Sequence, residues 1–239
     1  LAMYQAKARN GDQFYFYTEV LNRHSRQRFR QEMDLRQALK NNEFFLLFQP
    51  QFDIHKKKLL AVEALIRWRH PRKGVILPLA FIPAAEDSGL IINLGEWVLR
   101  EACKQIVSWH SEGLPYIRTA VNIATQQLKQ SNFAELVQSL LEEYKVPPQY
   151  LELEITENVI ITHPDVLHML NQLKKIGVKI VLDDFGTGNS SLNYLKKAHI
   201  DGLKIDKDFI SNISQSRSDE VIIEAIITMG KSLGFKVLA

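Results

Sequence analysis

Residues 151–188 read LELEITENVIITHPDVLHMLNQLKKIGVKIVLDDFGTG and contain two apolar strand patterns on either side of one helical pattern. The strands are expected at 150–157 and 179–183, and the helix between them at 165–176. Strands that alternate with helices are typical of a parallel sheet with right-handed crossover connections. This stretch therefore predicts an α/β fold.

The same alternation extends in both directions along the chain. Further strands are expected at 44–52, 59–68, 119–124, 202–207 and 235–239, and further helices at 78–110 (broken at 88–89), 133–144, 191–197 and 219–233. Only a polar, basic turn separates the first two strands, so they should form a hairpin. The pattern predicts a barrel that has seven of the eight strands required for closure, with the C-terminal strand missing from this sequence.

The first 42 residues differ from this pattern. A helical fragment without a start signal precedes a turn and an aromatic strand at 14–17, which suggests the tail of a preceding domain. Residues 22–41 resemble a charged amphipathic helix with apolar positions at Phe29, Met33, Leu35 and Leu39. The expected parts are a domain tail at 1–20, a linker helix at 21–42 and the barrel domain at 43–239.

Composition limits the class of protein. With 239 residues, of which 46% are hydrophobic, the chain can bury one large core. A net charge of +3 permits an anionic ligand but does not indicate nucleic acid. We expect no signal peptide and no membrane segment, because no apolar run has the necessary length. The single cysteine, Cys103, excludes an internal disulfide framework and fits a reducing compartment.

Polar side chains that can bind metal ions lie at the ends of several expected strands. They are Glu63, Asn122, Glu154, Asp183 and Asp184. In α/β barrels the C-terminal ends of the strands carry the chemistry, and these hard oxygen donors suit magnesium, manganese or calcium better than zinc. A carboxylate shared by two cations is the arrangement used for in-line phosphoryl hydrolysis. Single carboxylates elsewhere, at Glu152, Asp201 and Asp206, are interpreted as helix caps or surface ion pairs.

Adjacent aspartates cannot both face inward on a regular strand, so Asp183 should end the strand and Asp184 should begin the loop 185–188. Two cations complete the pattern. Arg67 shares a strand face with Glu63 and would supply a forked cation for a phosphate, and Lys204 would place a point charge near the attacking water. Residues 67–73 also fit a basic aromatic patch for nucleic acid, but the inward face of Arg67 favours one ligand contact followed by a solvated loop.

Six motifs occur in the order found in the EAL-domain cyclic di-GMP phosphodiesterases, which this chain resembles from about residue 44 to 239. The motifs are FQP (48–50), EALIRW (63–68), VNI (121–123), LEITE (153–157), DDFGTG (183–188) and LKID (203–206). Residues 1–17 resemble the end of a GGDEF domain. The resemblance therefore implies a parent protein with a GGDEF–EAL tandem.

This resemblance implies a modified TIM (β/α)8 barrel with an antiparallel first strand. It implies hydrolysis of cyclic di-GMP to linear pGpG with two Mg²⁺ or Mn²⁺ ions. The implied metal ligands are Glu63, Asn122, Glu154 and Asp183 for one ion, with Asp183 and Asp184 reaching a second. The implied catalytic residues are Glu63, Lys204, Asp183 and Asp184; the implied substrate-binding residues are Gln49, Leu65 and Arg67; and Glu157 would anchor the loop that follows Asp184.

Further expectations concern partners and location. The resemblance implies a homodimer in the bacterial cytoplasm, joined to an upstream GGDEF domain in the parent protein. Whether a more N-terminal region tethers the parent protein to a membrane stays open. Calcium should inhibit, because it occupies oxygen sites without holding the tighter octahedral geometry of magnesium.

The chain departs from the family pattern in two places. Asn189 stands where family members usually carry an aromatic residue, and the family continues past residues 237–239 into a glutamate of the second metal site and an eighth strand with a substrate-contacting glutamine. Two alternatives therefore stay open: a receptor that binds cyclic di-GMP without hydrolysis, or an inactive fragment of an active parent. Degenerate receptors typically lose Glu63 or the aspartate pair, both of which this chain keeps.

Overall fold

The computed structural model describes residues 19–239 apart from 55, 164, 187–197, 212 and 214–216. The elements expected at 1–17 and 191–197, and the position of Asn189, lie outside these residues. Two compact units are distinguished. Unit 1 comprises the described residues up to Phe45 together with Arg67–Leu94, and unit 2 comprises Leu46–Ile66 and Gly95–Ala239.

The sheet contains all seven predicted strands in the order β1-β2-β4-β5-β6-β7-β8. They are β1 (Phe44–Asp53), β2 (Lys58–His70), β4 (Arg118–Asn122), β5 (Leu151–Thr156), β6 (Lys179–Phe185), β7 (Gly202–Ile205) and β8 (Lys236–Leu238). Strands β2 and β4 to β8 are parallel, whereas β1 neighbours β2 across a short connection and runs antiparallel. The α/β class and the antiparallel first strand are confirmed.

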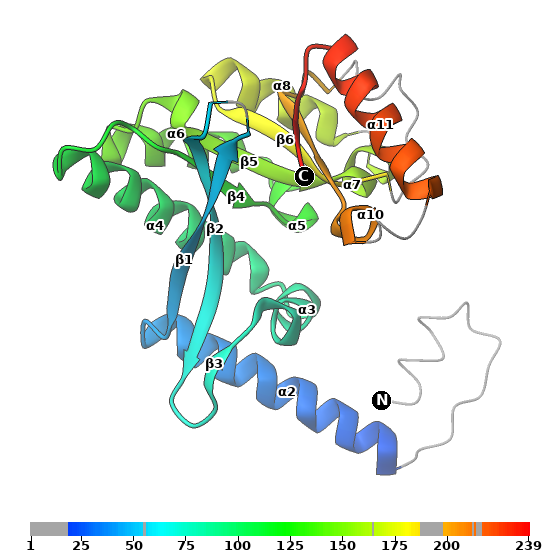
Figure 1. Ribbon diagram of the computed structural model, residues 1–239. Coiled ribbons are helices and arrows are strands. Elements are labelled where there is room, and N and C mark those ends of the chain that lie inside the picture. Colours follow the sequence, from blue (N-terminus) through cyan, green and yellow to red (C-terminus); the bar gives the residue numbers. More distant parts are fainter. Residues whose placement is uncertain (1–18, 55, 164, 187–197, 212, 214–216) are drawn as a thin grey trace. The chain divides into compact units, whose positions relative to one another are not determined.

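Helices cover the parallel strands of unit 2, which curl into a half-barrel (Figure 1). Within the described residues, the α-helices of unit 2 are α4 (Ile91–Ser111, its first turn in unit 1), α5 (Thr125–Leu128), α6 (Phe133–Tyr144), α7 (Glu157–Thr162), α8 (Val166–Ile176), α10 (Lys207–Ser211) and α11 (Arg217–Ser232), and a 3-10 turn (Pro148–Tyr150) precedes β5. Helix α8 packs on β6, and α11 packs on β7 and β8. The short α5, α7 and α10 were not predicted, because helices of one or two turns show no periodicity.

Unit 1 has a small aromatic core. Phe44, Trp68 and Phe81 lie with ring centroids 5.7–5.8 Å apart, and the indole of Trp68 donates to Glu43 at 3.0 Å. The unit also holds α2 (Glu19–Lys40), β3 (Gly74–Ile76), a 3-10 turn (Pro78–Ala80) and α3 (Ile82–Asp87). The expected long helix breaks as predicted, with Gly89 at φ +73° between α3 and α4.

The amphipathic face of α2 is only partly as expected. Leu35 is buried and Leu39 is half-buried, but Phe29 and Met33 are 64% and 52% exposed. The hairpin strand β3 pairs with the end of β2 and was missed because a three-residue strand after a turn has no period-two signal. Among the described residues, no helix combines the length and apolar character needed to cross a membrane.

The carboxylate of Asp201, which directly precedes β7, bonds residues at the N-terminal end of β6. It accepts hydrogen bonds from Lys174, from Lys179 at 2.9 Å and from the backbone N–H of Ile180 at 2.9 Å. Burial would raise the pKa of Asp201, but these donors outweigh it and hold the pKa below its ordinary value. Glu152 similarly forms an ion pair with Arg118 at 3.3 Å. Both residues form ion pairs as predicted, but the pairs are not at the surface: Glu152 is buried, and Asp201 is part-buried.

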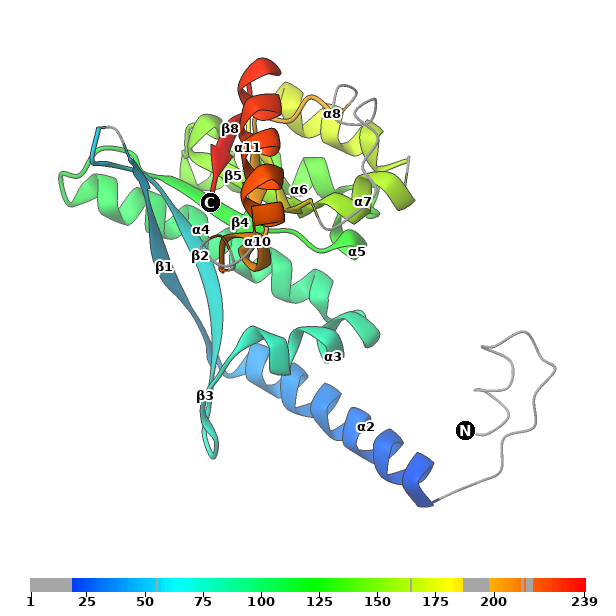
Figure 2. The same cartoon turned by 45° about the vertical axis from the view of Figure 1, so that its right-hand side comes forward.

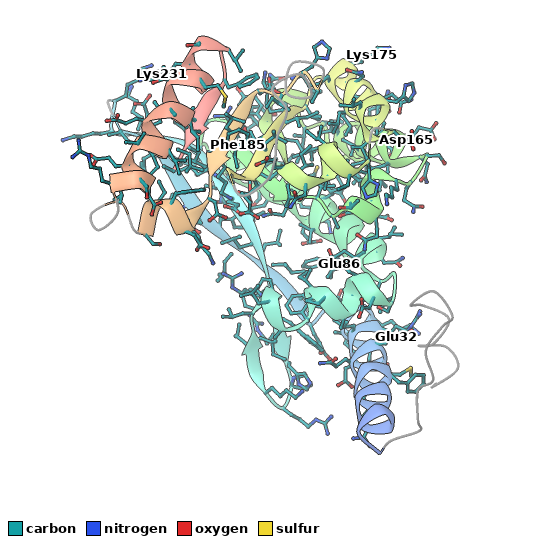
Figure 3. The ribbon with its side chains drawn as sticks, turned by 90° about the vertical axis from the view of Figure 1, so that its right-hand side faces the viewer. Glu32, Glu86, Asp165, Lys175, Phe185 and Lys231 are labelled. Carbon is teal, nitrogen blue, oxygen red and sulfur yellow. The ribbon has the colours of Figure 1, made fainter. Side chains whose placement is uncertain are left out.

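We expect Asp201→Asn to lower the free energy of unfolding by about 1–3 kcal/mol at pH 7, because two cations and one N–H lose an ionised acceptor. Since the native pKa is depressed, this stabilisation exists above the ordinary aspartate pKa and disappears as the pH falls through the native value. Urea denaturation at pH 7 and pH 3 measures the difference. The matched control is Asp165→Asn, at an exposed position before α8 (Figure 3); equal effects of the two substitutions at pH 7 would contradict the argument.

Candidate active site

Five of the predicted site residues come from neighbouring strands of unit 2 and meet in space. They are Glu63 on β2, Asn122 on β4, Glu154 on β5, Asp183 on β6 and Lys204 on β7. Strand register explains part of this convergence, since Asn122 lies opposite Glu154 and Thr156 lies opposite Asp183. In Figures 1 and 2 the helices that follow β4 and β7, α5 and α10, lie at the same end of the unit. The C-terminal ends of the strands therefore carry the cluster.

The ammonium group of Lys204 lies at the centre of three carboxylates. Its Nζ donates to Glu63 Oε2 at 2.8 Å, to Glu154 Oε2 at 2.9 Å and to Asp183 Oδ2 at 3.3 Å. The side chain of Asn122 donates from Nδ2 to Glu63 Oε1 at 2.8 Å. These contacts bring residues that are 141 positions apart in the sequence into one hydrogen-bonded group.

The cluster has more acids than cations, and its acids are poorly hydrated. Glu154 is 1% exposed, and its second oxygen, Oε1, has no hydrogen-bond partner within the described part of the chain. Burial raises the pKa of Glu154 to about 8; Lys204 opposes this rise, and the charge of Glu63 adds to it. For Lys204, burial would lower the pKa, but Glu154, Asp183 and Glu63 together raise it. The ammonium therefore stays charged throughout the neutral range.

The two adjacent aspartates lie in a β-bulge. The expectation that Asp183 ends its strand is wrong, because β6 continues to Phe185 and its register with β7 shifts between Leu182 and Phe185. Asp184 takes up the bulge with φ +53°, and its N–H donates to Asp183 Oδ1 at 2.9 Å. Phe185 then returns to the core of unit 2, where it is 7% exposed (Figure 3). The bulge frees the pair from strict alternation.

Asp184 also pairs with Asp206, a contact that the sequence reading missed. Desolvation, the charge of Asp183 and a hydrogen bond with the Asp206 side chain raise the pKa of Asp184. Asp206 is 9% exposed, and its Oδ1 accepts from the N–H of Asp208 at 2.7 Å at the start of α10. The predicted cap at Asp206 is thus present. Only the position of Asp206 two residues after Lys204 could have signalled the second contact.

Glu157 contacts the backbone just beyond the aspartate pair. Its Oε2 accepts from the N–H of Gly186 at 2.9 Å, and the residue is 2% exposed. Gly186 has φ +104°, and a Cβ there would lie 2.9 Å from a ring carbon of Phe209. A residue with a side chain is therefore excluded at position 186 both by the backbone and by space.

The predicted substrate-binding residues come from the first two strands. Gln49 is exposed on β1, and Leu65 is half-buried on β2, both within unit 2. Arg67 lies further along β2, where the chain belongs to unit 1.

The donor chemistry fits a hard divalent cation. Among the described residues no group of three or more His, Cys, Asp or Glu side chains is arranged to hold a metal ion; the three carboxylates contact Lys204 instead. The buried acceptor Glu154 Oε1, which has no donor among the residues that the structure describes, is nevertheless an oxygen that a cation would satisfy.

Comparison with known proteins identifies the family. The profile of the EAL domain matches residues 32–239. The chain belongs to the EAL domain family. This EAL domain is 41% identical over its whole length to the signaling protein YkoW of Bacillus subtilis, and 38% identical to MucR of Pseudomonas aeruginosa, named a bifunctional diguanylate cyclase/cyclic di-GMP phosphodiesterase. It spans 30% and 35% of those two proteins.

A solved structure gives the same result. The fold of this EAL domain superposes on a structure titled PaMucR phosphodiesterase, cyclic di-GMP complex, with a TM-score of 0.84 and 40% sequence identity. The match covers 87% of this chain and 85% of the other. The family predicted from the six motifs is therefore confirmed.

Proposed function

We propose that this EAL domain hydrolyses one phosphodiester bond of cyclic di-GMP to give linear pGpG. The observation that carries the proposal is the convergence of Glu63, Glu154 and Asp183 on Lys204 at the C-terminal ends of the strands. Support comes from a similar protein, the MucR domain, whose structure is titled as a phosphodiesterase in complex with cyclic di-GMP.

The residues proposed to hold metal carry the oxygen ligands that suit a hard divalent cation. Glu63, Asn122, Glu154 and Asp183 would hold one Mg²⁺ or Mn²⁺, and Asp183 with Asp184 would reach a second. A bound cation of this kind supplies Lewis acidity and lowers the pKa of water so that it can attack phosphorus.

The chain's own groups bind and orient the reactants. Lys204 keeps its proton at neutral pH and would orient the attacking water through its ammonium group. Arg67 would bind a phosphate through its forked guanidinium, and Gln49 and Leu65 would contact the rest of the substrate. Glu157 would keep the backbone at Gly186 in the position that orients Asp184.

The deciding experiment measures pGpG formation from cyclic di-GMP. We expect turnover with Mg²⁺ or Mn²⁺, none with EDTA and inhibition by Ca²⁺. Glu63→Ala should abolish turnover, whereas Glu135→Ala, at an exposed position of α6, should not. Binding of cyclic di-GMP without pGpG formation, with either metal, would support the receptor alternative instead.

Context within a longer protein forms a second part of the proposal. The chain spans about a third of the curated relatives reported above, one of which is named as bifunctional. We infer an upstream GGDEF domain ending near residue 20, a linker helix at 21–42, a homodimer and a bacterial cytoplasmic location. Sedimentation of the domain at several concentrations tests the homodimer, which a purely monomeric species would exclude.

Substitution of Glu157 should show whether it acts by accepting the N–H of Gly186. We expect Glu157→Ala to reduce kcat/KM by about 10–100-fold, the usual effect of losing a group that orients a metal ligand. Glu157→Gln, which keeps an acceptor oxygen, should retain most activity. Hydrogen exchange at the Gly186 amide should accelerate in the alanine variant only; equal exchange in both variants would contradict this role.

A further inference from the structure

The side chain of Gln127 lies inside the turn that follows Asn122. Gln127 is 3% exposed, and its Oε1 accepts a hydrogen bond from the N–H of Ala124 at 3.0 Å. Ala124 directly precedes α5, whose third residue is Gln127. The bond therefore closes the turn between β4 and α5 from within, in the manner of one half of a capping box.

Gly95 of α4 provides the space for this carboxamide. A Cβ at position 95 would lie 2.1 Å from Gln127 Nε2 and 2.3 Å from its Cδ. Gly95 lies within a regular helix, so the contact requires the absence of a side chain and not an unusual backbone angle. The carboxamide is thus held between α4 and the turn.

A buried carboxamide at position 127 lowers the stability of the fold unless it performs a function. Within the described part of the chain, Gln127 Nε2 is buried and has no hydrogen-bond partner. A buried donor without a partner destabilises the fold, and an apolar side chain of the same length would avoid that cost. An apolar side chain at position 127 would, however, lose the hydrogen bond that the N–H of Ala124 donates to Gln127 Oε1.

The two residues after Asn122 are both tied down. The N–H of Ile123 donates to the carbonyl oxygen of Glu154 at 2.8 Å, and the N–H of Ala124 donates to Gln127. The bond from Ile123 extends the pairing of β4 with β5. The bond from Ala124 lies just past the end of that pairing. Asn122, which bonds Glu63, therefore lies at the end of β4, and the side chain of Gln127 fixes the backbone that follows this strand.

We propose that Gln127 is a positioning residue for Asn122: by holding the backbone at Ala124 against the Gly95 face of α4, it sets the affinity of the site for divalent cations. This inference rests on the proposed function, because it takes Asn122 as a metal ligand. Gln127 itself touches neither metal nor substrate.

Two substitutions disturb the contact from opposite sides. Gln127→Met removes the acceptor at similar volume, and Gly95→Ala pushes a methyl group into the carboxamide. We expect each to weaken Mn²⁺ binding by about 10–100-fold, the range typical for groups that orient metal ligands. The readout is Mn²⁺ binding followed by electron paramagnetic resonance, which needs no turnover.

Controls separate positioning from general stability. Ile106→Val in the buried face of α4 reduces packing, and Gln138→Met removes an exposed carboxamide from α6; both should bind Mn²⁺ like the parent protein. Gln127→Glu keeps an acceptor oxygen for Ala124 and should bind Mn²⁺ more tightly than Gln127→Met, which covers the case in which the methionine variant folds poorly.

The outcomes distinguish the inference from the function on which it rests. If the parent protein binds Mn²⁺ and hydrolyses cyclic di-GMP while Gln127→Met and Gly95→Ala bind Mn²⁺ equally well, the positioning role is wrong and the proposed function stands. An equal loss of affinity in Ile106→Val would also overturn it, since the effect would then reflect stability alone. If the parent protein binds no Mn²⁺, the proposed function and this inference fail together.

Discussion

Glu154→Gln should reduce hydrolysis of cyclic di-GMP by about a thousandfold and at the same time make the metal-free protein more stable. The carboxylate is 1% exposed and shares one ammonium group with Glu63 and Asp183. Glutamine keeps the shape and an acceptor for Lys204 but removes one of the crowded charges. Loss of a group that stabilises charge at a reaction centre lowers turnover by about a thousandfold, the expected result here.

The stability change has a defined pH dependence. Burial raises the pKa of Glu154 to about 8, above the ordinary glutamate value of 4.5, so ionisation is harder in the folded state. The parent protein should therefore lose stability relative to Glu154→Gln as the pH rises between these two values, and the difference should level off above pH 8. A gain of at least about 1 kcal/mol for the variant at pH 8 in EDTA is expected, since one pKa unit corresponds to about 1.4 kcal/mol.

Urea denaturation in EDTA from pH 5 to 9 measures this gain, with Glu135→Gln at an exposed position of α6 as control. A variant that is inactive and also less stable than the parent at pH 8 would show that Glu154 is held by favourable contacts and not under electrostatic strain.

Much of the fold could be predicted because its signals are local. Period-two alternation places Glu63, Asn122, Glu154 and Lys204 on inward faces of their strands, and parallel pairing brings the ends of neighbouring strands together. The seven strands of the main path and the break at Gly89 follow from the same reasoning.

What could not be predicted depends on contacts between segments or on irregular backbone. The bulge at Asp183 and Asp184 is a shift of register against β7, which a single strand's pattern does not reveal. The contact between Gln127 and Gly95 joins two helices, and each residue alone resembles an ordinary helical position. The sharing of Lys204 by three acids is likewise invisible in sequence, because spacing places residues on a face but does not set distances.

Lys204→Met should have the opposite effect on stability from Glu154→Gln, although both should lose activity. Removing the ammonium leaves Glu63, Glu154 and Asp183 without their common donor in a poorly hydrated site. Loss of one partner from a buried ion pair typically costs about 3–5 kcal/mol, and we expect a decrease of this size in EDTA at pH 8. Acidification should reduce the loss, because protonated carboxyl groups no longer repel one another.

The matched control is Lys104→Met, which removes an ammonium from an exposed pair with Glu101 on α4 and should cost less than about 1 kcal/mol. Added Mn²⁺ should raise the melting temperature of Lys204→Met more than that of the parent protein, because a cation that binds the folded state replaces the missing positive charge. Equal stabilities of the two lysine variants in EDTA would mean that the ammonium of Lys204 does not hold the acids together. An excess of acids around one cation requires opposite changes in the free energy of unfolding: an increase when the charge of Glu154 is lost and a decrease when the charge of Lys204 is lost.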